Sequence, residues 1–175
     1  ADSDPTNDAG QIARSGSGAI YTVDQDATRR DNPTMPDQSD EIRYRESVCG
    51  LEPEQLAGFH VGWPRKPSPV DFLASLRGSS HVVLAIDSND RVIGVAAAIS
   101  DGVLFAYVSH LEVLPGHQGF GIGTELMQRL LRQLGEFYAI DLSCDEEVVP
   151  FYRRLELTAG TAMMLRRREL IPTDV

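Results

Sequence analysis

A glycine-rich segment lies between a long apolar strand pattern and the clearest amphipathic helix pattern of the chain. The segment, residues 117–124, has the sequence HQGFGIGT. Residues 103–113 before it are predicted to form a long strand, and residues 122–134 place Leu, Ile and Met side chains on one face of a helix. Glycine allows positive φ angles and lets the backbone approach a ligand closely. The chain must therefore place this loop where a strand of a sheet turns into a helix.

Strand and helix patterns alternate along the rest of the chain from residue 41. Clusters of Gly, Pro, Asn and Asp separate them, as is typical of loops and turns. We predict an α/β fold, a mixed sheet in three layers with helices on both faces. The predicted strands are residues 42–45, 81–86, 91–99, 103–113, 138–144 and 162–166, and the predicted helices are residues 53–61, 70–77, 122–134 and 146–155.

The first 40 residues differ in composition from the rest. They contain 8 Asp and 3 Arg, a charge of −5, which is half of the formal net charge of −10. Only 10 of the 40 are apolar. We therefore expect residues 1–40 to be an acidic, low-complexity and flexible extension, and residues 41–175 to form one domain. One short apolar stretch, residues 19–23, is suited to dock on the domain or on a partner.

The composition argues against several classes of protein. The longest apolar stretch, Val92 to Ile99, is far shorter than the ~20 residues that span a bilayer, and the Asp-rich start does not resemble a secretory signal. Cys49 and Cys144 are far apart, so neither a disulfide framework nor a cysteine metal site is indicated. An acidic chain is a poor nucleic-acid binder. We expect a soluble, cytoplasmic protein that binds no metal, membrane or nucleic acid.

The glycine-rich loop fits neither of two common nucleotide-binding patterns. A phosphate-binding P-loop needs Lys after its last glycine, but Ile122 follows Gly121, and the only lysine of the chain is Lys66. The dinucleotide fingerprint needs a third glycine where this chain has Thr124. An anion is still expected, because free N–H groups and the helix dipole meet at the start of such a helix.

Two motifs resemble the GNAT superfamily of acyl-CoA-dependent N-acetyltransferases. The pattern Leu111-x-Val113-x-Pro115-x-x-Gln118-x-x-Gly121-x-Gly123 resembles its pyrophosphate motif. Residues 149–155, about 30 residues later, resemble its second conserved stretch. The resemblance covers residues 42–168, nearly the whole predicted domain. It implies a GNAT-like fold and acetyl-CoA as co-substrate, with no metal.

The resemblance also implies which residues hold acetyl-CoA. In the family, backbone amides of the loop hold the CoA pyrophosphate, and the strand before the loop pairs through its backbone with the pantetheine arm. Carried onto this chain, the implied cofactor-binding residues are Leu111, Val113, Gln118, Gly119, Phe120, Gly121, Ile122, Gly123 and Thr124.

Tyr152 matches the family's usual general acid, which protonates the departing CoA thiolate. A phenol suits this role because it is neutral near pH 7 and can donate a proton. Family members usually carry Gly after the Leu of the second stretch, to end the helix in a left-handed turn. Here Glu156 stands at that position, and a residue other than Gly in that turn costs about 1 kcal/mol.

The general base has several candidates in the sequence. Glu112 and His110 are two residues apart on the predicted strand, so they share one of its faces beside the implied thioester. Asp141 on the next strand is a third candidate. Ser109 or Tyr107 could act through a water on the opposite face. Some members of the family have no dedicated base.

The implied acceptor site lies between the first two helices and the last strands, where Phe59, His60, Trp63 and Phe72 are candidates to line it. We expect acetyl transfer to a primary amine of a small molecule, by direct attack of the amine on the thioester. The alternatives are a protein or peptide N-acetyltransferase and a non-catalytic acyl-CoA-binding sensor. A homodimer is possible.

Overall fold

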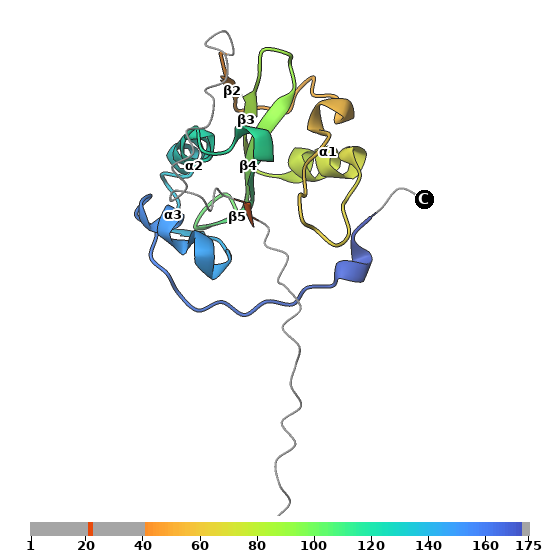
Figure 1. Ribbon diagram of the computed structural model, residues 1–175. Coiled ribbons are helices and arrows are strands. Elements are labelled where there is room, and N and C mark those ends of the chain that lie inside the picture. Colours follow the sequence, from red (N-terminus) through yellow and green to blue (C-terminus); the bar gives the residue numbers. More distant parts are fainter. Residues whose placement is uncertain (1–20, 23–40, 173–175) are drawn as a thin grey trace, which may run out of the picture.

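The computed structural model describes residues 21–22 and 41–172, which contain a six-stranded mixed sheet (Figure 1). Strand β5 is central to it, because it pairs antiparallel with β4 along one edge and parallel with β1 and β6 along the other. The strand order is β1-β5-β4-β3-β2, with β6 beside β5. The strands are β1 (Tyr21–Thr22), β2 (Arg43–Arg45), β3 (His81–Ile86), β4 (Val92–Ser100), β5 (Phe105–Val113) and β6 (Ala139–Asp141).

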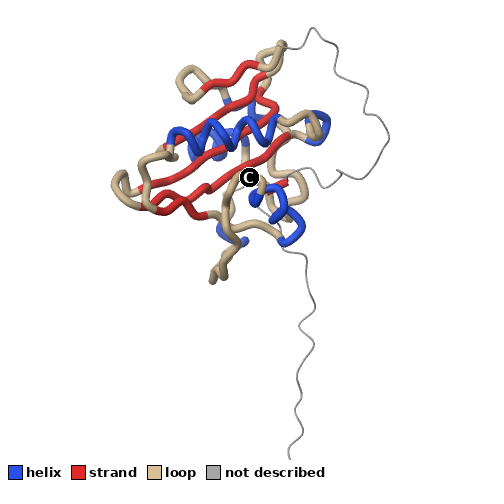
Figure 2. Tube along the Cα trace, turned by 90° about the vertical axis from the view of Figure 1, so that its left-hand side faces the viewer, coloured by secondary structure: helices blue, strands red, loops and turns tan. Residues whose placement is uncertain are grey.

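Helices cover both faces of the sheet, so the predicted three-layer arrangement is confirmed (Figure 2). The 3₁₀ helix η1 (Pro53–Leu56) and α1 (Pro69–Gly78) share a core with one face. Helices α2 (Ile122–Gln133) and α3 (Val149–Arg153) share a core with the other. In the described ranges, no helix is long and apolar enough to cross a bilayer.

Helix α2 packs closely on the sheet because strand β4 carries a glycine beneath it. A Cβ atom on Gly94 would lie only 2.8 Å from Cδ1 of Leu126. The absence of that atom lets Leu126, Met127 and Leu130 become fully buried. The predicted amphipathic face of residues 122–134 is thus the face that packs, and it fixes the start of α2 relative to β5.

A β-bulge interrupts strand β5. Ala97 of β4 pairs with His110, but the next residue, Ala98, pairs with Val108, so Ser109 is an extra residue on β5. A bulge of this kind reverses the alternation of side chains between the two faces.

The bulge decides which face each side chain of β5 meets. Val108 before it and Leu111 after it pack in the same core, under α2 and α3. Without the bulge, the side chains of His110 and Glu112 would share the face of Val108. With it, they turn to the face covered by α1.

Two predicted elements differ from the structure: one is shorter than predicted, and the other is not a strand. The predicted helix 53–61 is only η1, because Gly58, His60 and Gly62 all have positive φ angles and break it. The predicted strand 162–166 is irregular and exposed. After α3 the chain passes beneath the sheet to the α1 side (Figure 1), so residues 162–166 do not extend the sheet beside β6.

Two further predicted elements are confirmed only in part. The predicted strand 138–144 is reduced to β6, which covers only the start of β5. The predicted helix 146–155 is divided into a 3₁₀ turn, η3 (Glu146–Val148), and α3. The early end of β6 leaves the second half of the β5 edge without β6 as its neighbour.

Strand β1 uses part of that edge. Tyr21 pairs with Leu111 and Thr22 with Glu112, in parallel. These two residues belong to the apolar stretch 19–23, which the sequence suggested as a docking segment. The other residues of the extension lie outside the described ranges, so its flexibility stays a prediction.

Although Glu156 stands where family members usually carry Gly, the chain forms a left-handed turn at this residue. Glu156 has a φ of 66°, its N–H donates to the carbonyl of Arg153, and the N–H of Leu157 donates to the carbonyl of Tyr152. This pair of hydrogen bonds is the Schellman ending of a helix, in which Gly is the preferred residue at the left-handed position.

Replacing Glu156 by Gly should therefore stabilise the domain. We expect Glu156→Gly to raise the free energy of unfolding by about 1 kcal/mol, because glycine adopts this conformation without steric cost. Chemical denaturation measures the change. Glu156→Ala removes the charge but keeps the strain, so it should give no such gain. Equal stabilisation by both variants would contradict the explanation.

Candidate functional site

The glycine-rich loop forms one wall of a small cavity at the start of α2. Gly119 and Gly121 have φ angles of 84° and 80°, which few other residues adopt. Gly121 is the N-cap of α2, so the loop turns directly into the helix. The cavity has a volume of about 130 Å³.

This cavity has the features of an anion site. Ile122, Gly123 and Thr124 form the first turn of α2, whose N–H groups have no acceptor within the helix. A Cβ on Gly121 would meet no atom within 4 Å. Arg154, a cationic residue, also lines the cavity. Donors and a positive charge thus surround a space about large enough for a phosphate group.

Most of the implied cofactor-binding residues line this cavity, and two do not. Leu111 is fully buried in the core, so only its backbone is available to a ligand, and Phe120 packs half-buried against the same core. The Nε2 atom of Gln118 donates to the carbonyl of Val113 at 2.8 Å, so this side chain fastens the loop to the end of β5. The implied residues that line the cavity are Val113, Gln118, Gly119, Gly121, Ile122, Gly123 and Thr124.

His117, Phe151 and Arg154 also line this cavity and were not among the residues named from the sequence. Phe151 and Arg154 lie in the second motif, residues 149–155. The spacing of the two motifs was visible in the sequence. That α3 brings Arg154 opposite the loop depends on how the helices pack.

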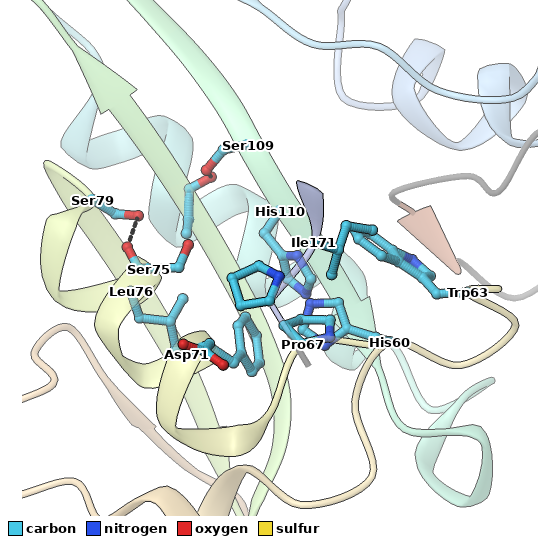
Figure 3. A pocket seen from close by; sticks show the side chains of 13 residues that line it. His60, Trp63, Pro67, Asp71, Ser75, Leu76, Ser79, Ser109, His110 and Ile171 are labelled. Atoms are coloured by element: carbon cyan, nitrogen blue, oxygen red, sulfur yellow. Dashed lines mark hydrogen bonds between the residues drawn. The ribbon is translucent and has the colours of Figure 1, made fainter. Parts of the chain in front are cut away.

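A second and larger cavity, of about 310 Å³, lies between α1 and the sheet (Figure 3). Helix α1 contributes Asp71, Phe72 and Ser75, and the loop before it contributes His60 and Trp63. Strand β5 contributes Ser109 and His110. Of the four residues expected at the acceptor site, three line this cavity, and Phe59 is buried in the core against Phe72.

Aromatic rings form much of the cavity wall. The ring of His60 lies 4.7 Å from that of Trp63 and 4.5 Å from that of Phe72, measured between centroids. The ring of His110 lies 5.2 Å from His60 and 4.9 Å from Phe72. These edge-to-face and tilted contacts hold the two imidazoles at one end of the cavity.

Glu112 is a buried carboxylate, 1% exposed, that connects β5 to this loop. Its Oε2 accepts the N–H of His60 and its Oε1 accepts the N–H of Val61, each at 3.0 Å. The Nε2 atom of His110 lies 3.3 Å from Oε2, close enough for an ion pair, although it does not have the geometry of a hydrogen bond. The carboxylate thereby fixes the turn in which His60 has a φ of 61°.

These contacts set the charges of the cluster. Burial alone would raise the pKa of Glu112, but His110 and the amides of Val61 and His60 outweigh it and hold that pKa below its usual value. Burial, together with His110, lowers the pKa of His60 to about 4, against the opposing effect of Glu112. At neutral pH Glu112 is therefore ionised and His60 is uncharged.

The other candidate catalytic residues are not all near this cluster. Ser109 lines the same cavity as His110, so the expectation that it faces the opposite side is wrong, because the bulge lies at this residue. The hydroxyl of Tyr107 donates to Oγ of Ser143 at 3.1 Å. Asp141 is exposed on β6. Tyr152 is 3% exposed within the core under α2 and α3, and it lines neither cavity.

Strand β5 joins the two cavities. His110 lines the larger cavity and Val113 lines the smaller one. Three residues of a strand correspond to about 10 Å. The β5 edge between them, which β1 partly covers, connects the anion site to the imidazoles.

Comparison with known proteins supports one family. The model of the Acetyltransferase (GNAT) family matches residues 48–156. The histone acetyltransferase TAP1 of Glycine max is 36% identical over 112 residues, which is 57% of this chain and 48% of the relative. The uncharacterized N-acetyltransferase ycf52 of Porphyra purpurea is 36% identical over 109 residues, 59% of this chain and 62% of the relative. The chain thus spans about half to three-fifths of these relatives.

Solved structures show the same fold. A Deinococcus radiodurans R1 protein described as an acetyltransferase aligns with a TM-score of 0.72 and 44% identity, covering 73% of this chain and 90% of its own. The GNAT-family protein SP0256 of Streptococcus pneumoniae TIGR4 aligns with a TM-score of 0.59 and 28% identity, over 74% of this chain and 98% of its own.

Replacing Glu112 by Gln should destabilise the domain. A glutamine side chain has one acceptor oxygen where the carboxylate has two, so one buried N–H loses its partner, at a cost of about 2 kcal/mol. Urea denaturation measures the loss. Glu46→Gln, at an exposed position, is the matched control and should change stability by less than about 0.5 kcal/mol. Equal effects of the two variants would contradict this role of Glu112.

Proposed function

This chain belongs to the Acetyltransferase (GNAT) family, and on that premise we propose that it transfers the acetyl group of acetyl-CoA to a primary amine of a small molecule. The observation that carries the proposal is the pair of cavities on β5. One presents helix N–H groups and Arg154, and the other presents two imidazoles beside Trp63 and Phe72.

The smaller cavity supports the donor assignment. The CoA pyrophosphate would accept hydrogen bonds from the N–H groups of Gly121 to Thr124, with Arg154 adding positive charge. The pantetheine arm would pair with the β5 edge at Leu111 to Val113. The thioester would then reach the part of β5 beside the bulge, where His110 faces the larger cavity.

The volume of the larger cavity favours a small molecule as acceptor. About 310 Å³ is at the lower end of the range for small-molecule pockets. An alkylamine has a pKa of ~10.4 and is about 99.9% protonated near neutral pH. The ionised Glu112 and the Asp71 carboxylate attract such a cation, which must lose a proton before its nitrogen can attack.

We assign the general base to His110 and a positioning role to Glu112. His110 lines the cavity, and an imidazole is a suitable proton acceptor near neutral pH. Glu112 is the less suitable base, because its oxygens already accept two N–H groups and its pKa is lowered. As the amine nitrogen bonds to the carbonyl carbon and the C–S bond breaks, the amine proton passes to His110 and the sulfur takes up a proton.

Tyr152 is proposed to supply the proton to the sulfur. Its family position supports this role. In the described structure its ring is buried under α2 and α3, so the role requires the arm of the donor to reach that core through the edge of β5.

Strand β1 and the pantetheine arm require the same backbone groups. Tyr21 and Thr22 pair with Leu111 and Glu112, on the edge assigned to the arm. Both cannot occupy it together. Binding of acetyl-CoA must therefore displace these two residues, and their pairing weakens the apparent affinity for the donor.

A second candidate is acetylation of a protein or peptide. The Glycine max relative carries the name histone acetyltransferase, and an amine at the end of a lysine side chain could enter the same cavity. A non-catalytic acyl-CoA sensor would bind the donor without turnover.

Release of CoA thiol from acetyl-CoA, measured across small primary amines and lysine peptides, tests the function. We expect release with small amines and little with peptides. Release with peptides alone would favour the second candidate, and tight donor binding without release on any acceptor would support the sensor.

Gly121→Glu should abolish donor binding. The new side chain would project into the anion cavity, where nothing else lies within 4 Å of its Cβ, and its charge would repel a pyrophosphate. Calorimetry with acetyl-CoA measures the loss. Gly102→Glu is the matched control, since Gly102 also has a positive φ and open space but lies in the β4–β5 turn. Unchanged affinity in Gly121→Glu would refute the donor site.

Thr22→Pro should improve the apparent affinity for acetyl-CoA. Proline removes the Thr22 N–H and disfavours strand pairing, and one hydrogen bond contributes about 1 kcal/mol, so the KM for acetyl-CoA should fall about fivefold. The kcat should not change. Thr22→Val keeps the N–H and the shape of the side chain and should behave as wild type. A higher KM in Thr22→Pro would show instead that β1 helps to hold the donor.

A further inference from the structure

The last described residues of the chain, Ile171 and Pro172, line the larger cavity. Residues 158–167 are exposed and form no strand or helix in the described structure. They cross from the α3 side of the sheet to the α1 side, where a short 3₁₀ turn, η4 (Arg168–Leu170), precedes Ile171 (Figure 1). Ile171 and Pro172 line the cavity together with Trp63, His60 and His110 (Figure 3).

A hydrogen bond ties this segment to the loop between η1 and α1. Nη1 of Arg65 donates to the backbone carbonyl of Glu169 at 3.0 Å. Arg65 follows Trp63 in the loop between η1 and α1, and Trp63 itself lines the cavity. The position of Ile171 is therefore linked to the same loop that Glu112 fixes at His60 and Val61.

Two neighbouring residues of the segment have opposite environments. Ile171 is half-buried and lines the cavity, whereas the side chain of Leu170 is 67% exposed and does not. An apolar side chain placed at a cavity wall sets the size of the space beside it. The polar part of the wall, His110 with Asp71, suits an amine, and Ile171 with Trp63 suits an apolar body.

We propose that Ile171 is a specificity-determining residue, which sets the length of the apolar body that an acceptor amine can carry. This inference rests on the proposed function only in taking the larger cavity as the acceptor site. The segment 168–172, held by Arg65, is then the outer wall of that site. This part of the wall comes from residues that pair with no strand of the described sheet.

The fluorescence of Trp63 offers a direct test, because it is the only tryptophan of the chain and it lines the cavity. Linear primary alkylamines from propylamine to octylamine are titrated into the full chain without acetyl-CoA. Binding is thus measured separately from turnover. The proteins compared are wild type, Ile171→Ala, Ile171→Phe and the matched control Leu170→Ala.

We expect the preferred chain length to follow the size of residue 171. Wild type should bind one length best. Ile171→Ala should bind longer amines best, and it should bind the length preferred by wild type about fourfold more weakly for each methylene group that the shorter side chain leaves exposed to water. Ile171→Phe should prefer shorter amines, and Leu170→Ala should match wild type. Equal profiles in wild type and Ile171→Ala, or no response of Trp63 to any amine, would overturn the proposal.

A second pair of variants tests the tie. Arg65→Ala should broaden the chain-length profile although Ile171 is unchanged, and Arg65→Lys, which keeps a donor, should restore much of the selectivity. If neither variant broadened the chain-length profile, the role of Arg65 in holding the segment 168–172 would be refuted.

Thiol release with the same amines separates this proposal from the proposed function. Amine binding that depends on residue 171, without thiol release from any of these amines, would refute small primary amines as acceptors and leave the role of Ile171 standing. Thiol release in wild type with unchanged chain-length profiles in the variants would refute the role of Ile171 alone.

Discussion

The bulge at Ser109 is the constraint on which the candidate site depends. Regular alternation along β5 would send His110 and Glu112 to the same core as Val108, where a carboxylate would be buried among apolar side chains. The extra residue turns both toward α1 instead. Glu112 can then accept the amides of His60 and Val61, which fixes the loop that lines the larger cavity. One inserted residue thus determines which layer of the fold holds the polar chemistry.

Strand β5 contributes residues to both cavities, so it sets their positions relative to each other directly. Its end meets the glycine-rich loop, where Gln118 holds the carbonyl of Val113, and its bulge lies beside the imidazoles. Helix α2 packs closely on the sheet at Gly94, so the start of α2 has a fixed position relative to the end of β5. The distance between the smaller cavity and His110 is therefore set by the backbone rather than by flexible side chains.

The sequence was sufficient for the layers, the glycine loop and the shared face of His110 and Glu112, because periodicity and spacing are local properties. The sequence does carry a sign of the bulge. The apolar positions of β5 in the core under α2 and α3 are even-numbered up to Val108 and odd-numbered from Leu111 onward. The strand predicted at 162–166 is wrong because an apolar pattern does not tell where the chain runs, and after α3 the chain crosses to the α1 side instead of pairing beside β6. Arg154 and Ile171 reach their cavities through packing and chain path, which no local pattern encodes.

The pairing of β1 has a consequence for the protein in the absence of any ligand. A strand edge with unpaired N–H and C=O groups is a template for pairing with other chains, and so promotes aggregation. Because β6 ends at Asp141, part of the β5 edge would be such a template. Tyr21 and Thr22 cover two of its residues, so a short segment of the acidic extension shields part of this edge from pairing with another chain.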